Sequence, residues 1–67
     1  MAPKERMAMR LKTLRERRGM TQEQLAEKSG VSRTYLARLE TGRQDPTLST
    51  LEKLATALKV DVAKLLK

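Results

Sequence analysis

Glycine and proline divide this chain into short segments, and that division limits what it can fold into. Gly19, Gly30 and Gly42 each follow a segment with helical apolar spacing, where a helix C-cap favours a residue that adopts positive φ without steric penalty. Pro46 directly precedes another such segment and prevents a helix from continuing into it. No stretch shows the strict alternation of a β-strand. The sequence therefore predicts an all-α, compact five-helix domain.

Apolar spacing and N-capping residues place the five helices. Thr21 is a favourable N-cap, and Gln24 three residues later completes a capping box. Further caps are predicted at Ser32, Thr47 and Asp61. The predicted helices span Lys4–Arg18, Gln22–Ser29, Arg33–Thr41, Leu48–Leu58 and Val62–Leu66. Stripes predicted to face the core are Met7, Leu11 and Leu14 in the first helix, and Leu48, Leu51, Leu54, Ala55 and Leu58 in the fourth.

The length and the missing residue types restrict the chemistry. With 67 residues, the chain is expected to form one domain over residues 1–67. It contains no cysteine and no histidine, which rules out disulfides and thiolate metal sites and removes the commonest general base. The sequence also lacks a Gly-rich phosphate loop and a cluster of metal ligands. We therefore expect no catalytic residues, no enzyme activity, no metal, no cofactor and no small-molecule ligand.

The chain is strongly basic, with 15 Lys and Arg against 8 Asp and Glu and a formal net charge of +7. Such a surface suits a polyanion, either nucleic acid or an anionic membrane. A membrane-surface helix rich in Trp or Phe is not expected, because the chain contains neither residue. No apolar run approaches the roughly 20 residues that span a bilayer, and residues 1–10 lack the apolar stretch of a signal peptide. We expect a cytoplasmic protein with no membrane partner.

One segment has the mechanical features of two helices that cross steeply at a tight turn. Ser29-Gly30-Val31-Ser32 joins the second and third predicted helices. Ala26 lies midway along the second helix, where a close crossing requires a small side chain. The apolar residues expected to hold the pair onto the rest of the domain are Leu25, Val31, Leu36 and Leu39.

The run TQEQLAEKSGVSRTYLARLETGR, at residues 21–43, resembles the helix-turn-helix of the phage repressor and Cro-type family, also called XRE-type. The segment LSTLEKLATALKV, at residues 48–60, continues the family's pattern. The resemblance implies a lambda-repressor-like DNA-binding domain with its recognition unit at about residues 21–42. It also implies sequence-specific binding of double-stranded DNA by a transcriptional regulator, either a repressor or a Cro- or controller-like switch. The alternative is a basic protein-interaction adaptor or an antitoxin-like partner-binding module.

The third predicted helix has an apolar side and a polar side. At 100° per residue, Leu36, Leu39 and Glu40 fall on one side of it. The apolar side must pack, so the other side faces outward. Arginine pairs with guanine O6 and N7 in the major groove, and threonine or alanine meets a thymine methyl. The predicted base-contacting residues are Arg33, Thr34, Ala37 and Arg38. A merely solvated charged face is the alternative.

Contacts to the DNA backbone are expected on both sides of this helix. Gln22 opens the second helix, where free backbone N–H groups favour an anion, and the resemblance implies that a glutamine here holds the DNA backbone. Tyr35 either places its hydroxyl on a phosphate or packs half-buried against the domain. Related proteins bring the loop after the recognition helix to DNA. The predicted backbone-contacting residues are Gln22, Tyr35, Thr41, Arg43 and Gln44.

Two opposite charges are predicted on inward faces. Arg15 shares the inner side of the first helix with Leu11 and Leu14, and Glu40 follows Leu36 by one turn on the packed side of the third. An unpaired buried charge is costly, so a structural salt bridge between the two helices is expected.

The resemblance also implies a partner copy. Family members place two domains on half-sites about one helical turn, 34–36 Å, apart. We expect a homodimer on double-stranded DNA with a palindromic operator. Val62, Leu65 and Leu66 in the last helix are the candidate dimer contacts. Alternatively this helix only closes the core, and the free protein is a monomer that dimerises on DNA.

Overall fold

Five helices make up the computed structural model, which describes residues 3–66. They are α1 (Pro3–Arg17), α2 (Gln22–Ser29), α3 (Arg33–Glu40), α4 (Leu48–Leu58) and α5 (Ala63–Leu66). Within the described residues there is no strand, so the predicted all-α class is confirmed. The predicted bounds of the second and fourth helices match. The first helix begins and ends one residue earlier than expected, the third ends one residue earlier, and the last begins one residue later. Of the predicted domain, residues 1, 2 and 67 lie outside the described part.

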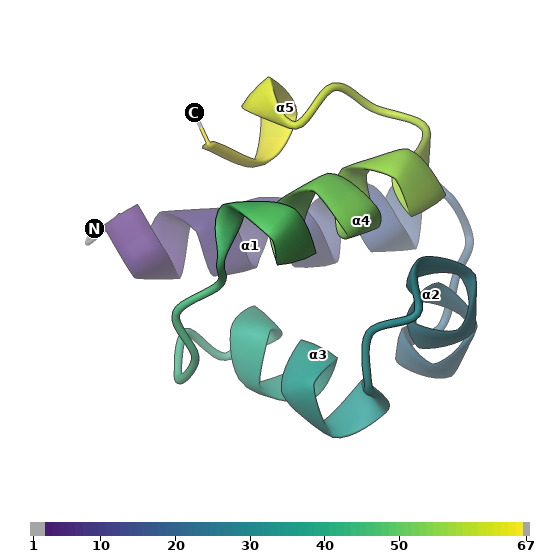
Figure 1. Ribbon diagram of the computed structural model, residues 1–67, viewed down its shortest axis with the longest axis horizontal. Coiled ribbons are helices and arrows are strands. Elements are labelled where there is room, and N and C mark those ends of the chain that lie inside the picture. Colours follow the sequence, from purple (N-terminus) through teal and green to yellow (C-terminus); the bar gives the residue numbers. More distant parts are fainter. Residues whose placement is uncertain (1–2, 67) are drawn as a thin grey trace.

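The helices surround a core of leucines. In Figure 1, α3 lies on one side of α1 and α5 lies on the other, and α1 contacts both. Helix α2 packs against α3 and α4, and α4 also packs against α5. Burying an aliphatic side chain of this size contributes about 1.5–3 kcal/mol. Every helix supplies at least one of the fully buried leucines, which are Leu11, Leu25, Leu36, Leu39, Leu54, Leu58 and Leu65.

The predicted caps form. The Thr21 hydroxyl accepts from the Gln24 N–H at 3.1 Å, while the Gln24 side chain accepts from the Thr21 N–H at 2.9 Å. Ser32 and Thr47 cap α3 and α4 in the same way, each accepting from the N–H three residues on at 3.1 Å. The Asp61 carboxylate accepts from the Ala63 N–H at 3.1 Å, at the start of α5. Local hydrogen bonding therefore fixes where each of these helices begins.

One expectation about α4 is wrong. Leu48 was expected in its inner stripe but is 59% exposed, because it is the first residue of the helix and lies beyond the edge of the core. The helix ends at Leu58, and its C-cap, Lys59, adopts a left-handed conformation with φ +59°. The three glycines take positive φ, as predicted. At the end of α4 a lysine adopts this conformation instead of a glycine. The Lys59 N–H is bonded to the carbonyls of Ala55 and Thr56, which compensates for the strain.

Candidate nucleic-acid interface

Helix α3 has the two faces that its sequence predicts. Leu36 and Leu39 are fully buried. On the other face Arg33, Thr34 and Arg38 are exposed, and Ala37 is half-buried between them. The packed leucines therefore fix the rotation of α3 about its axis, and that rotation directs both arginines to solvent.

The outward face of α3 lies in a surface hollow of about 370 Å³. Helix α2 contributes its first residue to this hollow, and the loop after α3 contributes Arg43. Three arginines line the hollow and no carboxylate does, so its potential is positive. The lining contains all four predicted base-contacting residues and three of the predicted backbone-contacting ones: Gln22, Arg33, Thr34, Ala37, Arg38, Thr41 and Arg43.

The turn before α3 sets the angle at which it leaves α2. Gly30 has φ +75°, and its N–H donates to the Ala26 carbonyl at 2.9 Å, closing α2. The buried Ser29 hydroxyl donates to the Ala26 carbonyl and accepts from the Val31 N–H, both at 3.3 Å. Ala26 itself is 8% exposed, at the crossing where a small side chain was predicted. The turn thus satisfies its own polar groups and leaves the N-terminus of α3 facing the hollow.

The predicted salt bridge joins α1 to α3. Arg15 donates to Glu40 through Nε at 2.7 Å and through Nη2 at 3.0 Å, a bidentate pair. The two side chains are 10% and 2% exposed. The hydrogen bond to Glu40 raises the pKa of Arg15 above its ordinary value, although burial acts in the opposite direction. Arg15 also donates through Nη1 to the Met20 carbonyl at 2.7 Å, which ties down the loop before α2.

Gln22 connects the Arg15–Glu40 pair to the hollow over α3. The sequence analysis did not predict this connection. The Gln22 Nε2 donates to Glu40 Oε1 at 3.1 Å. A carboxylate only accepts, so this bond fixes which way the amide points, and it leaves the second Nε2 hydrogen available. Since Gln22 and Glu40 are 18 positions apart, no local spacing rule connects them. The charge pair therefore positions a side chain of the hollow as well as two helices.

Comparison with known proteins gives the family. A helix-turn-helix family pattern matches residues 11–65. The chain belongs to this helix-turn-helix family. Over 57 residues it is 49% identical to the immunity repressor protein of Bacillus phage phi105, a stretch that is 85% of this chain and 40% of that repressor. The domain thus spans less than half of this relative.

Solved structures share the same fold. The helix-turn-helix domain superimposes with a TM-score of 0.89 and 38% identity on the restriction-modification controller protein C.AhdI from Aeromonas hydrophila, covering 91% of this chain and 92% of that one. A second neighbour is the controller C.Esp1396I, solved as a tetramer in complex with its natural 35 base-pair operator. Its TM-score is 0.86 at 29% identity, over 100% of this chain and 99% of that one. The domain is of the kind found in DNA-binding transcription regulators.

Two predicted backbone-contacting residues of the helix-turn-helix domain lie outside the lining of the hollow. Tyr35 is half-buried against the core, and its hydroxyl donates to the Asp45 carbonyl at 3.4 Å. Of the two interpretations of Tyr35, the packing role is therefore present in the structure. Gln44, in the loop between α3 and α4, is half-buried. The Tyr35 bond therefore ties α3 to the loop that carries Arg43.

The three candidate dimer contacts differ in their burial. Leu65 is fully buried and belongs to the core, so it is not available to a partner copy and that part of the prediction is wrong. Val62 is half-buried against the core, and Leu66 is 58% exposed. In a four-residue helix, only one of two adjacent leucines can point inward.

None of the helices in the described part of the chain is long and apolar enough to span a membrane. Among residues 3–66, no three acidic side chains gather where they could hold a metal ion.

Proposed function

We propose that this chain binds double-stranded DNA sequence-specifically and acts as a transcription regulator in the cytoplasm. The observation that carries the proposal is the hollow over α3, where one surface gathers three arginines, two threonines, an alanine and a glutamine and no carboxylate. Its relatives include a phage immunity repressor and restriction-modification controllers. We treat residues 1–67 as one domain with its recognition unit at about 21–42, and we assign it no catalytic role or cofactor.

In this proposal α3 enters the major groove and reads base edges. Arg33 and Arg38 lie more than one helical turn apart on the exposed face, so each would reach a different base pair. Each guanidinium matches the O6 and N7 acceptors of guanine, and a good bidentate pair contributes about 1–3 kcal/mol of discrimination. Thr34 and Ala37 lie between them and offer methyl groups to thymine.

Phosphate contacts follow from the donors that remain free. Gln22 keeps one Nε2 hydrogen after bonding Glu40, and Arg43 contributes a full charge. The Thr41 hydroxyl already donates its one hydrogen to the Arg38 carbonyl at 3.0 Å, and the Tyr35 hydroxyl donates to Asp45. These two hydroxyls reach a phosphate only by giving up those bonds. We therefore rank Gln22 and Arg43 first among the backbone contacts, ahead of Thr41, Tyr35 and Gln44.

We further propose that the chain binds a palindromic operator as a homodimer. One recognition helix covers only a few base pairs, which is too little to find a site among genomic competitors. The neighbour C.Esp1396I was solved as a tetramer on its operator, which supports an oligomer here. The exposed Leu66 and the half-buried Val62 are the candidate contacts.

Selection of bound duplexes from a random pool tests the proposal. We expect a palindromic site whose half-sites lie about one helical turn apart. On that site, log affinity should fall linearly with log salt, with a slope of about −0.9 for each phosphate neutralised. Lys53→Ala, on α4 and outside the hollow, should leave the selected sequence unchanged. Weak binding without sequence preference would instead favour the adaptor function.

A further inference from the structure

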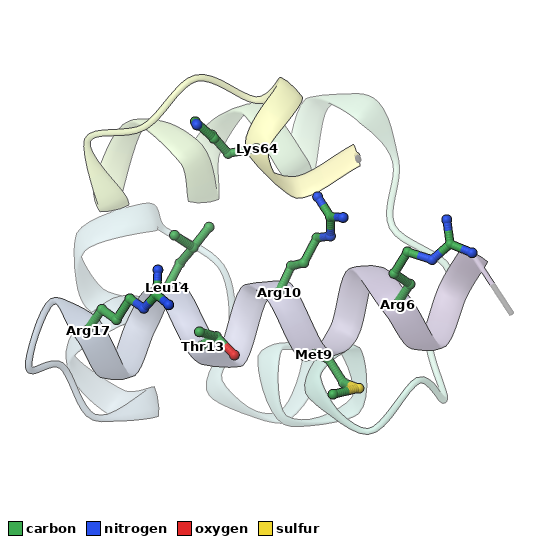
Figure 2. Close-up of a pocket in the computed structure, with 7 residues that line it drawn as sticks. All are labelled: Arg6, Met9, Arg10, Thr13, Leu14, Arg17 and Lys64. Carbon is green, nitrogen blue, oxygen red and sulfur yellow. The ribbon is translucent and has the colours of Figure 1, made fainter. Parts of the chain in front are cut away.

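A second basic groove lies beside α1, away from the hollow over α3. Its volume is about 490 Å³, and α5 contributes Lys64 to its edge. Because α3 and α5 lie on different sides of α1, and the two sites share no lining residue, both can be occupied at once. Figure 2 shows the residues that line it, which are Arg6, Met9, Arg10, Thr13, Leu14, Arg17 and Lys64.

The groove combines an apolar surface with a basic rim. Leu14 is half-buried against the core at the edge of the groove that faces α5. Met9, 56% exposed, lies at the opposite edge, where Figure 2 shows it pointing away from α5. Arginine stems add aliphatic surface while their charged ends stay in water. In Figure 2, Arg10 and Leu14 point from α1 toward α5. Four basic residues line the groove and no carboxylate does. Within residues 3–66, no carboxylate pairs with Arg10, Arg17 or Lys64.

The groove is long enough for several turns of a helix. Its α1 residues recur every three or four positions from Arg6 to Arg17, which makes one continuous stripe along α1. At 1.5 Å per residue, this stripe is about 16 Å long, or three helical turns. A binding helix that follows it would meet apolar and basic groups alternately along its length.

The chemistry of the groove selects its occupant. A second copy placed face to face would bring Arg10, Arg17 and Lys64 against the same three cations of the other copy. A nucleic acid would satisfy the rim but would leave Met9 and Leu14 without an apolar partner. A membrane surface takes up an amphipathic helix whose apolar face carries Trp or Phe, and the chain contains neither residue. An acidic amphipathic helix satisfies both parts, since its apolar stripe packs on Leu14 and the aliphatic arginine stems while flanking carboxylates meet Arg10, Arg17 and Lys64.

We propose that the α1–α5 groove is a docking site for an acidic amphipathic helix of a partner protein. The inference does not rest on DNA binding, because it uses none of the residues that line the hollow over α3. If both sites act, the partner is carried on the side of the domain that stays free when α3 is in a DNA groove. The domain then links an acidic protein to a DNA site.

The test uses the full chain and a designed probe. The probe is a fluorescein-labelled, helical 15-residue peptide with a leucine stripe flanked by glutamates. We expect its binding, followed by anisotropy, to weaken at least about tenfold for Arg10→Glu with Arg17→Glu. Probes with glutamine for glutamate, or with alanine for leucine, should each bind more weakly than the parent.

A charge-matched control separates docking from general attraction to a basic protein. Lys28→Glu with Lys53→Glu removes the same net charge from exposed positions on α2 and α4, and should leave probe binding within about twofold. Equal losses in the two double variants would overturn the proposal.

Amide chemical shifts of the wild-type chain provide a readout that does not depend on any variant folding. Unlabelled probe should shift Met9, Thr13, Leu14 and Lys64, and should leave Thr34, Ala37 and Arg38 unshifted. Chemical-shift changes centred on α3, or no changes at the groove with millimolar probe, would contradict the docking proposal. A DNA duplex should not compete with the probe, and full competition would identify the groove as a nucleic-acid contact instead.

Discussion

The hollow over α3 and the α1–α5 groove are both lined by basic side chains without a carboxylate, yet they suit different partners. The hollow contains Gln22, Thr34 and Thr41, and the Arg15–Glu40 pair holds Gln22 in place. The groove instead contains exposed Met9 and half-buried Leu14. Positive charge draws a polyanion to either surface. Hydrogen-bonding groups fixed by a buried network favour base edges and phosphates, whereas an apolar interior favours an amphipathic peptide.

The largest difference between the two sites should appear when the Arg15–Glu40–Gln22 hydrogen-bond network behind the hollow is removed. Glu40→Ala leaves Arg15 buried without its partner and should destabilise the fold by about 3–5 kcal/mol. A domain of this length is stable by only a few to about 10 kcal/mol. Urea unfolding should therefore show that the variant has lost a large share of the domain's stability at 25 °C.

A double variant provides the control for that loss. Arg15→Met with Glu40→Leu removes both charges and should recover much of the stability. It should not recover DNA affinity in full, because Gln22 then has no carboxylate to orient its amide. A nearly neutral Glu40→Ala would show that the pair contributes little to the fold.

Substitutions behind the hollow should affect the free energy of unfolding more than substitutions in the groove. Ala26→Leu adds a bulky side chain at the buried crossing behind the hollow, and it should cost about 1–3 kcal/mol. Met9→Ala in the groove should change stability by less than about 0.5 kcal/mol, because Met9 is 56% exposed. Thermal unfolding of both variants checks this. Similar melting temperatures would mean that the α2–α3 crossing tolerates a larger side chain.

Base readout should be sensitive to the exposed arginines of α3 and insensitive to those of the groove. Arg38→Ala should lower affinity for the selected operator by about 1–3 kcal/mol and relax preference at one base position. Arg33→Ala should do the same at another position, and neither should alter the melting temperature appreciably. Binding titrations against a panel of single-base operator variants measure both quantities. Unchanged preference in both variants would remove α3 from base recognition.

The smallest effect on stability is expected at α5. Leu66→Glu should change folding by less than about 0.5 kcal/mol, because Leu66 is 58% exposed. If Leu66 contacts a partner copy, sedimentation with operator DNA should show two wild-type protomers on each site and cooperative binding that the variant loses. One wild-type protomer on a non-palindromic site would reject the dimer.

Much of the fold and of the candidate site follows from the sequence. The caps at Thr21, Ser32 and Thr47 form within three residues, so residue identities alone predict where those helices begin. The apolar period in α3 places Leu36 inside and Arg38 outside without knowledge of any other helix. Even the Arg15–Glu40 pair was predictable, because each charge lies on the apolar side of its own helix.

Only the tertiary structure decided how these helices meet. The bond from Gln22 to Glu40, the burial of Leu65 and the exposure of Leu48 all depend on where one helix lies against another. The α1–α5 groove exists because the short last helix lies beside α1 and leaves a hollow along it. Local rules reach about four residues along the chain, whereas these contacts join residues many positions apart. They form only when the leucines of all five helices share one core, so the sequence determined the elements and packing determined the surfaces between them.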